Sequence, residues 1–530
     1  GLDVDGSNSD GNANSGGNIK AFTKIQLQIP SITGLNVQDF KVTFAYSCNT
    51  PDSTGVTVTK EGTDEEPIYK YAANKGNYRL WQTNLEARNP EEISEEGGNF
   101  IKTGVAYTFE DLGAALGETL TLYVEGINPS LSTAQDAITV TLTHNTEAIT
   151  ASDSVTITAV KSQILPDWDR NGVINADDSN RVHKNKPWVM WVNDDKDKDA
   201  NANGTADNAS DQPANDFPGQ ADSDLLDLKV NGMRDLLDFY PIFLDLKETI
   251  KVLPTDGYIY KVSSTVALNM TSTSLKKENS YAYLKERVYN DEVHKKAVSN
   301  IEDGVTLSAA WLDQVVNSDN HDGILLFEAI GKQEDAEIVL QIMNKTTQNI
   351  IFEVKLPIQT VGVLDLIRHK NLRVIAGGTG GFPNQPEEVV QPSCMNSEDT
   401  LFWMHGYNVG GDAATATFAE VYKRFFHTGF SGHFYGVSWA GDPELAGPAP
   451  HYHQAIANSF ATGRVYRTFV NNYKKVNEDA GLEGKIFAAA HSMGNVVHNV
   501  AIQGDKYYVS GEGNLVDPMK FDKYFSIDAA

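Results

Sequence analysis

The stretch Ala490-His491-Ser492-Met493-Gly494 holds residues that could do nucleophilic chemistry. It follows the apolar run KIFAAA, which is typical of a buried strand, and precedes NVVHNVAIQ, whose apolar spacing is typical of a helix. A serine between small residues on such a strand-to-helix turn presents its hydroxyl on a strained backbone, where it can attack an acyl carbonyl. We therefore predict that Ser492 is a nucleophile.

A second motif, His405-Gly406-Tyr407, ends the apolar run TLFWM upstream of the serine. Together the two motifs resemble an α/β-hydrolase of the lipase/esterase kind, although Ala490 replaces the first glycine of the family's G-x-S-x-G sequence. The resemblance covers residues 366–530 and implies a parallel sheet covered by helices on both faces. It also implies that the backbone N–H groups of Met493 and Tyr407 form the oxyanion hole.

The family's triad runs in the order serine, acid, histidine. Asp528, at the end of the run FSIDAA, resembles the acid of pancreatic-type lipases, while many relatives place the acid one strand later. His498 is the single histidine after the serine, and six residues along a helix turn it away from Ser492. His491 is expected beneath the turn, and the resemblance gives His405 the task of shaping the oxyanion loop.

His451 and His453 occur in GPAPHYHQ, which we expect to be a loop on the active-site rim, so either could be an unorthodox base. The family's histidine normally follows two further strands that this sequence lacks. Without them the last strand would be a bare apolar edge. We therefore expect the base to come from residues outside this chain, as a C-terminal continuation beyond residue 530 or a companion fragment.

The regions before the hydrolase-like part have the alternation of strands. Residues 19–160 and 246–365 contain period-two patterns such as KVTFAYS and AEIVLQIMN, separated by clusters of turn residues. We predict two all-β, Ig-like sandwiches there. Residues 1–18 are polar and glycine-rich and are expected to be a flexible lead-in. Residues 161–245 are rich in Asp and Asn and are predicted to form a separate calcium-binding module.

The calcium prediction depends mainly on the stretch DWDRNGVINADD. Oxygen-bearing side chains stand at positions 1, 3, 5, 9 and 12, a glycine at position 6, and a residue offering its carbonyl at position 7. This spacing suits a calcium ion and resembles an EF-hand loop, with the Asp at position 12 of a dockerin. The predicted ligands are Asp167, Asp169, Asn171, Val173, Asn175 and Asp178.

Two less regular stretches lie further along the same region. The predicted ligands of the second loop are Asp199, Asn201, Asn203, Thr205 and Asp207, with a serine where a final carboxylate is wanted. A third, partial loop would use Asn231, Asp235 and Asp238. The ions are expected to be structural, because so many carboxylates repel one another without counter-ions.

The net charge of −28 argues against nucleic acid as a partner, because like charges repel. Weak calcium sites suit extracellular calcium levels, so we expect an exported, cell-surface or secreted protein of a bacterium. The first functional hypothesis is a serine hydrolase that cleaves an ester or lipid substrate, with the β-domains as stalk or positioning modules. The alternative is a surface adhesion or assembly protein that uses an inactive hydrolase fold as a scaffold.

Overall fold

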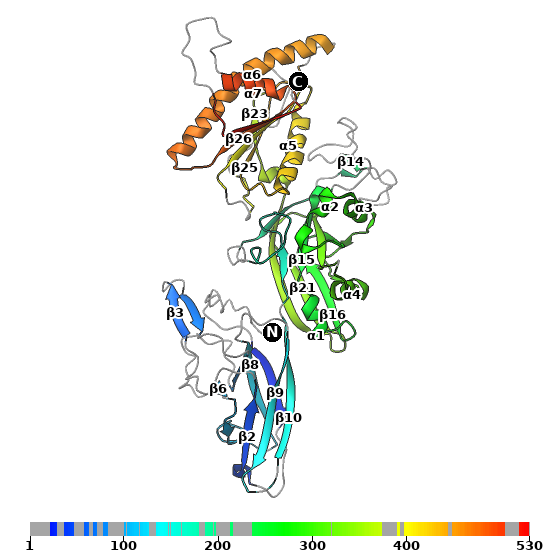
Figure 1. Cartoon of the computed structure of the whole chain (residues 1–530), viewed down its shortest axis with the longest axis vertical. Coiled ribbons are helices and arrows are strands. Elements are labelled where there is room, and N and C mark those ends of the chain that lie inside the picture. The colour runs from blue at the N-terminus through cyan, green and yellow to red at the C-terminus, as the bar shows by residue number, and fades with distance from the viewer. Residues whose placement is uncertain are drawn as a thin grey trace.

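The computed structural model shows three units that follow one another along the long axis (Figure 1). The residues that it describes are 22–28, 36–46, 58–62, 67–71, 78–82, 100–101, 103–115, 117–126, 134–146, 148, 150–160, 162–179, 186–193, 196–197, 213–215, 236–319, 321–373, 389–392, 397–443, 448–503 and 519–528. The lead-in predicted for residues 1–18 lies outside this set. None of the described helices is both long and apolar enough to cross a membrane.

The first unit packs two four-stranded antiparallel sheets face to face, in the orders β1-β8-β5-β6 and β10-β9-β2-β7. Alternate side chains of the strands point inward and form one apolar core. A separate hairpin pairs β3 with β4. The strands are β1 (Phe22–Gln28), β2 (Phe40–Ala45), β3 (Val58–Gly62), β4 (Pro67–Tyr71), β5 (Tyr78–Trp81), β6 (Phe100–Ile101), β7 (Ala106–Tyr107), β8 (Thr119–Gly126), β9 (Ala134–His144) and β10 (Thr150–Ala159).

The second unit packs two five-stranded sheets, in the orders β11-β15-β20-β17-β18 and β12-β22-β21-β16-β19. Its strands are β11 (Ile164–Pro166), β12 (Trp188–Trp191), β15 (Phe239–Leu244), β16 (Tyr258–Ser264), β17 (Leu268–Ser272), β18 (Ser299–Asn300), β19 (Val305–Thr306), β20 (Ile324–Ala329), β21 (Gln333–Asn344) and β22 (Ile350–Val361). Its helices are α1 (Lys247–Val252), α2 (Ala282–Lys285), α3 (Arg287–Lys295) and α4 (Ala309–Asn317).

The predicted boundary at residue 245 is wrong. Strands β11, β12 and β15 come from the Asp/Asn-rich region, yet they pair with β15, β22 and β20 respectively and complete both sheets of the second unit. The runs Trp188–Trp191 and Phe239–Leu244 are fully buried, so each strand needs packed neighbours on both of its faces. The sheets of the second unit provide these neighbours. The region between residues 161 and 245 therefore belongs in part to the sandwich. Its other described strands are the short β13 (Lys196–Asp197) and β14 (Pro213–Asn215), which pair with each other.

The third unit is a parallel five-stranded sheet in the order β23-β25-β24-β26-β27. Its strands are β23 (Arg368–Asn371), β24 (Thr400–Met404), β25 (His433–Ser438), β26 (Ile486–His491) and β27 (Lys523–Ile527), and its helices are α5 (Gly411–Phe426), α6 (Pro448–Asp479) and α7 (Gly494–Gln503). Leu401 and Trp403 of β24 share a core with α5, and Phe402 and Met404 share one with α6 and α7. The helices therefore cover both faces of the sheet.

The second and third units share one hydrophobic core. The indole N–H of Trp191 donates to the Asp238 carboxylate at 2.6 Å, and the Lys423 ammonium of α5 lies 2.7 Å from the same carboxylate. Asp238, a predicted ligand of the third cation loop, is instead fully buried in this ion pair. A paired charge at the junction fixes the two units against each other, because separating the partners would leave a charge buried alone.

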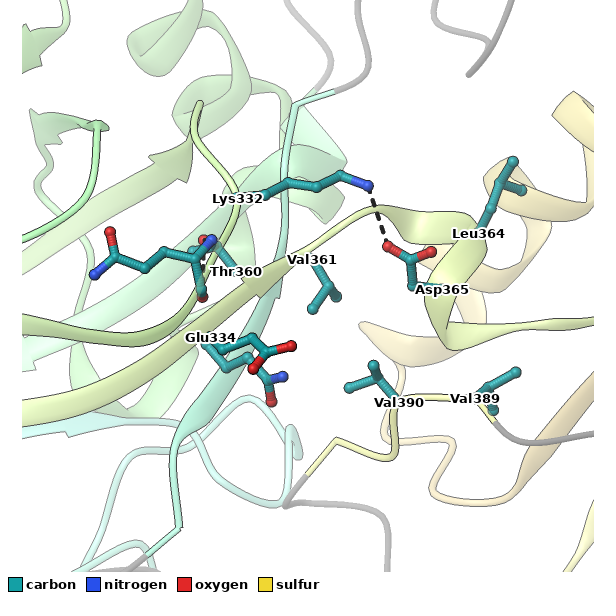
Figure 2. A pocket seen from close by; sticks show the side chains of 10 residues that line it. Lys332, Glu334, Thr360, Val361, Leu364, Asp365, Val389 and Val390 are labelled. Carbon is teal, nitrogen blue, oxygen red and sulfur yellow. Dashed lines mark hydrogen bonds and ion pairs between the residues drawn. The ribbon is translucent and has the colours of Figure 1, made fainter.

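A second contact between these units borders a polar pocket of about 490 Å³ at the end of β22 (Figure 2). The Lys332 ammonium reaches across to the Asp365 carboxylate at 3.1 Å, and the peptide N–H of Val390 donates to the Asp365 carbonyl at 2.9 Å. Lys332 and Asp365 are both at least half exposed, so their ion pair contributes little to stability.

Candidate functional site

The predicted nucleophile occupies a strained turn. Ser492 follows β26 and precedes α7, and its φ of 49° places a non-glycine residue in the left-handed region. Its N–H donates to the Ile527 carbonyl at the end of β27 at 3.0 Å, so the neighbouring strand holds the turn. An added Cβ on Gly494 would lie 2.5 Å from the His405 carbonyl, so only a glycine lets α7 start this close to β24.

Asn495, a residue of α7, also holds the turn at Ser492. The Asn495 side-chain amide, which is almost fully buried, donates to the Ser492 carbonyl at 2.8 Å, and its oxygen accepts from the Tyr524 hydroxyl. The backbone N–H of Asn495 donates to the same Ser492 carbonyl at 3.0 Å. This carbonyl therefore points into the helix, and the N–H of the same peptide unit, which belongs to Met493, points the opposite way.

The loop after β24 packs directly on this turn. A Cβ placed on Gly406 would lie 3.1 Å from the Ser492 Cβ and 2.9 Å from His491 Nδ1. The Gly406 carbonyl accepts from His405 Nδ1 at 2.9 Å, so the N–H of Tyr407, in the same peptide unit, points away from that bond. The N–H groups of Tyr407 and Met493 donate to no residue in the described part of the chain. Among the described residues, the turn at Ser492 and the loop beside it therefore carry two unpaired N–H groups.

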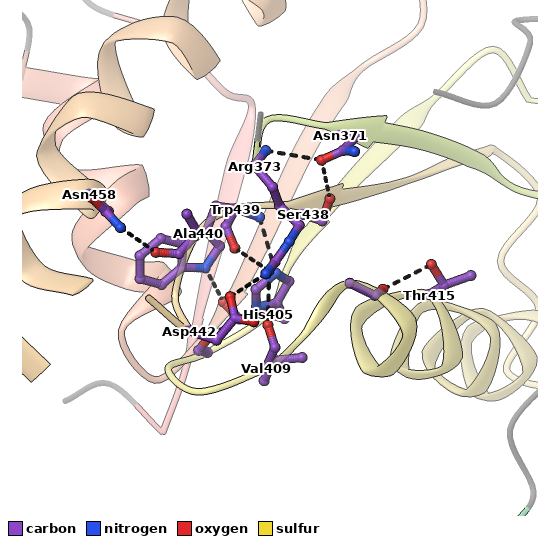
Figure 3. A network of polar contacts seen from close by, with 12 residues as sticks. Asn371, Arg373, His405, Val409, Thr415, Ser438, Trp439, Ala440, Asp442 and Asn458 are labelled. Carbon is purple, nitrogen blue, oxygen red and sulfur yellow. Dashed lines mark hydrogen bonds and ion pairs between the residues drawn. The ribbon is translucent and has the colours of Figure 1, made fainter. Parts of the chain in front are cut away.

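His405 fixes the shape of this loop. Burial lowers its pKa to about 3, so the ring is neutral and Nε2 accepts from the Trp439 N–H at 3.1 Å. The Trp439 indole N–H donates back to the His405 carbonyl at 2.8 Å. These bonds join the loops after β24 and β25 and are drawn in Figure 3. With a pKa this low, the His405 ring stays neutral near neutral pH.

Arg373 also joins the loop after β24 to the loop after β25 (Figure 3). Its guanidinium is fully buried, donates to the carbonyls of Val409 and Trp439 at 3.0 and 2.9 Å, and forms an ion pair with Asp442. The N–H of Asn408 also donates to the Gly441 carbonyl at 2.9 Å. We call these contacts of Arg373 the arginine clamp; it holds the loop that carries Tyr407.

The other histidines lie in different surroundings. His498 is fully buried against the rings of Tyr466, Phe521 and Tyr524, and burial lowers its pKa to about 3, so this histidine packs inside the unit. His491 does not lie beneath the turn as predicted; it is exposed, and its Nδ1 lies 2.9 Å from where a Cβ on Gly406 would be.

His451 and His453 lie on the first turns of α6, not in a loop, because the helix already begins at Pro448, where proline is tolerated. His451 Nδ1 lies 2.7 Å from the Tyr407 hydroxyl. Asp528 follows Ile527, whose carbonyl accepts from Ser492, and is exposed with a φ of 46°. Within the described residues, no histidine hydrogen-bonds the Ser492 hydroxyl. The acid candidate Asp528 comes directly after the residue whose carbonyl accepts from the Ser492 N–H.

The first predicted cation loop forms a compact acidic cluster. Oxygens of Asp167, Asp169 and Asp178 all lie within 4.8 Å of one another and could hold a metal ion. Asp167 is fully buried, and burial together with the charge of Asp178 raises its pKa to about 7. A cation would relieve this repulsion. Gly172 takes a φ of 93° at the predicted position 6 and donates its N–H to Asp167 at 2.8 Å.

Most of the other predicted cation ligands either shape the turn or lie outside the described residues. The side-chain oxygens of Asn171 and Asn175 accept the N–H groups of Val173 and Asp177, both at 2.7 Å, and so shape the turn. The second loop, Asp199 to Asp207, and the residues Asn231 and Asp235 of the third lie outside the described residues.

The loop from Asp167 to Asp178 also touches the third unit. Arg170, at position 4 of the loop, is almost fully buried, donates to the Phe426 carbonyl at the end of α5 at 2.7 Å, and places its guanidinium 4.0 Å from the Phe426 ring centroid. It stabilises a helix C-terminus, where a positive charge is favourable.

No family model and no curated protein matches the chain. Among solved structures, E. coli alpha-2-macroglobulin is similar at 10% identity with a TM-score of 0.17, over 65% of this chain and 16% of that one. The C-terminal domain of the Streptococcus agalactiae AgI/II polypeptide BspA is similar at 12% identity with a TM-score of 0.14, over 68% and 97% of the two chains. That of the Streptococcus pyogenes antigen I/II-family protein AspA gives 11% and 0.15, over 66% and 95%. Structural similarity this weak supports no conclusion about fold or function.

Two residues of the site, Arg373 and Asn495, were not predicted from the sequence. Arg373 is a single cation after a short strand, and Asn495 is one amide at the start of an apolar helix. The available signal is a polar residue at a position where burial is expected, since such a residue is retained only when it has partners.

Proposed function

We propose that this protein is a serine hydrolase that cleaves acyl esters, with Ser492 as its nucleophile. The observation that carries the proposal is the left-handed turn at Ser492 together with the backbone N–H groups of Tyr407 and Met493, which have no partner among the described residues. The serine oxygen would attack the acyl carbonyl, and the two N–H groups would stabilise the negative oxygen that forms. Collapse would release the alcohol and leave an acyl-enzyme, which water then hydrolyses.

The proton of Ser492 needs a base, which we propose is a histidine outside the described residues. A continuing polypeptide or a companion fragment could supply it. Asp528 is our candidate for the acid that orients this histidine, because Ile527, the residue before it, binds the Ser492 N–H. The two β-units would then serve as a stalk that presents the hydrolase-like unit.

A fluorophosphonate probe tests this proposal on the protein isolated from its native source. We expect covalent labelling at Ser492, located by mass spectrometry of the modified peptide, and complete loss of labelling in the Ser492→Ala variant. The matched control is Ser459→Ala on α6, which should label normally because Ser459 is buried and bonds within its own helix. Native protein that does not label, or labels equally in Ser492→Ala, would contradict the proposal.

The second candidate function is a surface adhesion or assembly protein in which the hydrolase fold is an inactive scaffold. One observation favours it: the Ser492 hydroxyl has no hydrogen-bonded base among the described residues. The exposed rings and chains of Phe525 and Ile527 on the edge strand β27 would then contact another molecule in the assembly. Absence of labelling by the fluorophosphonate supports this candidate over the first.

We further propose that Ca²⁺ is the ion held by Asp167, Asp169 and Asp178. Carboxylate oxygens with a glycine at the turn suit a hard cation of calcium's size. Weak loops of this kind are filled where calcium is millimolar, which supports an extracellular or cell-surface location. The ion would be structural: it would set the loop whose Arg170 contacts α5.

Removing calcium should lower the melting temperature of the protein. With calcium at about 100 times its dissociation constant, EDTA should lower the melting temperature by about 5–10 °C, because binding stabilises the folded state by mass action. Differential scanning calorimetry with and without added calcium measures the shift. The calcium-dependent shift should disappear in Asp178→Asn and remain in Asp177→Asn, an exposed neighbour outside the cluster. Equal shifts in the two variants, or none in wild type, would contradict a calcium site here.

A further inference from the structure

The side chain of Tyr407, whose backbone N–H is one of the two proposed oxyanion donors, contacts the start of α6. Its hydroxyl lies 2.7 Å from His451 Nδ1. Its ring meets the rings of His451 and Tyr452 edge to face, with the ring centroids 5.4 Å apart in both pairs. Edge-to-face rings attract each other beyond the area that they bury, and a hydrogen bond adds a preferred direction. The first turns of α6 therefore hold both the ring and the hydroxyl of Tyr407.

The other described contacts of this loop act on the neighbours of Tyr407. The Asn408 N–H donates to the loop after β25 at 2.9 Å, and the Val409 carbonyl accepts from the arginine clamp at 3.0 Å. On the other side, the Gly406 carbonyl accepts from His405 Nδ1 at 2.9 Å, but Gly406 has no side chain that could anchor the peptide unit it shares with Tyr407. The Tyr407 side chain is thus the link between α6 and the residue that carries the N–H.

The part of α6 that makes this contact is itself fixed to the sheet. The side-chain amide of Asn458 is buried and donates to the Ala440 carbonyl, in the loop after β25, at 3.0 Å (Figure 3). Asn458 follows His451 by two helical turns, so the two side chains lie on the same face of α6. Ala455, which lies between them on that face, is fully buried. His451 is therefore presented by a fixed helix, which positions a side chain more precisely than a loop does.

We propose that His451 is a positioning residue of the active site. Through the Tyr407 side chain, it keeps the Tyr407 N–H where negative charge develops on the acyl oxygen. The inference rests on the proposed hydrolase function, in which this N–H is a donor. His451 then has a different task from the base considered from the sequence, because a positioning residue exchanges no proton with Ser492.

This task predicts which kinetic constant depends on His451. A displaced N–H stabilises the transition state less well, whereas the bound substrate, which carries no developed charge, is affected little. Loss of the contact should therefore lower kcat and leave KM nearly unchanged. A residue that only stabilised the fold would lower the amount of active protein without selecting a side-chain atom.

The contact uses one particular atom of the histidine ring, and amide side chains can test for that atom. Depending on its tautomer, Nδ1 accepts from the Tyr407 hydroxyl or donates to it, and an amide oxygen or nitrogen can do the same. Asparagine carries these atoms as far from Cβ as Nδ1 lies, whereas glutamine carries them one bond further. We therefore expect His451→Asn to preserve the contact and His451→Gln to lose it.

Kinetics of p-nitrophenyl ester hydrolysis by variants of the full-length protein test the proposal. His451→Gln should lower kcat by about fivefold, the factor that one typical hydrogen bond contributes to an equilibrium, and KM should change by less than about twofold. Tyr407→Phe should show the same loss, and the double variant no further loss, because both changes remove one bond. His451→Asn should retain the wild-type kcat. Ala457→Gln, at an exposed position of the same helix, is the control and should behave as the wild type.

Three results would overturn the proposal. Wild-type kcat in His451→Gln or in Tyr407→Phe would show that the contact is not needed. Equal loss of kcat in His451→Asn and His451→Gln would show that the imidazole itself is required, as it would be for a base.

Hydrogen exchange separates failure of this inference from failure of the proposed function. If the wild type neither hydrolyses esters nor labels with the fluorophosphonate, the hydrolase proposal fails, and exchange at the Asn408 amide still reports how firmly the loop is held. This amide is bonded across to the loop after β25, so it exchanges when the loop opens. It should exchange faster in His451→Gln than in His451→Asn, and equal rates would overturn a role of His451 in holding the loop.

Discussion

Replacing Gly406 by alanine should lower kcat/KM for ester hydrolysis by about 10²–10³-fold, the loss that follows removal of one oxyanion donor. The added Cβ would lie 2.9 Å from His491 Nδ1, closer than Cβ atoms are found, and 3.1 Å from the Ser492 Cβ, a contact so tight that its neighbour must shift. The loop must therefore move away from the turn, and it takes the Tyr407 N–H with it. The effect should fall on kcat, because the donor acts on charge that develops in the transition state.

Gly410→Ala is the matched control for this prediction. Gly410 belongs to the same loop, just before α5, and an added Cβ there meets only the Asp442 carboxylate at 3.6 Å, an ordinary van der Waals contact. This variant should retain the kcat/KM of the wild type. The measurements are the hydrolysis of a p-nitrophenyl ester and the rate of fluorophosphonate labelling. Equal losses in the two variants would show that the loop, and not the N–H of Tyr407, is what the chemistry requires.

The sequence was informative where a short motif determines local geometry. A serine between small residues, after an apolar strand, predicts a strained turn, and the structure places Ser492 at a φ of 49°. The alternation in the β-regions likewise predicts two-layered sheets, and the first unit is built in this way. Both patterns act over a few residues, so they can be recognised without knowing what packs against them.

Long-range partners could not be predicted in the same way. Strands β11, β12 and β15 come from a region whose acidic composition suggested a separate module, but their buried apolar runs pair with strands 80 to 170 residues away, as in the contacts Trp188–Ile358 and Phe239–Glu328. Asp238 looked like a cation ligand, and its partner is Lys423. In each case the deciding contact comes from a distant part of the chain, which a single sequence does not reveal.

Arg373 is another long-range partner of this kind, because it pairs with Asp442. Its removal gives the second prediction with a large expected effect. Arg373→Met should lower the free energy of unfolding of the third unit by about 3 kcal/mol, because Asp442 is left partly buried without its partner. It should also reduce ester hydrolysis by at least about tenfold, since the carbonyls of Val409 and Trp439 lose the donor that joins their loops. Chemical denaturation and the p-nitrophenyl ester assay measure the two effects.

The pH dependence of this variant distinguishes a lost charge pair from general damage. Burial already raises the pKa of Asp442, and Arg373 opposes that rise. Without the arginine the folded-state pKa of Asp442 should rise further above its unfolded value. The stability of the variant should then be greatest at acid pH and fall as pH rises through that pKa, so its deficit relative to wild type should be larger at pH 8 than at pH 5. The exposed Arg424→Met on α5 is the control and should show neither effect.

A double variant separates the two tasks of the arginine clamp. Arg373→Met with Asp442→Asn removes the unpaired charge, so part of the lost stability should return and the pH-dependent deficit should disappear. Activity should stay low, because the double variant still lacks the guanidinium that joins the loop of Tyr407 to the loop of Trp439. If activity recovers together with stability, the guanidinium serves only to neutralise the charge of Asp442. The hydrogen bonds between His405 and Trp439 would then be enough to hold the loop of Tyr407.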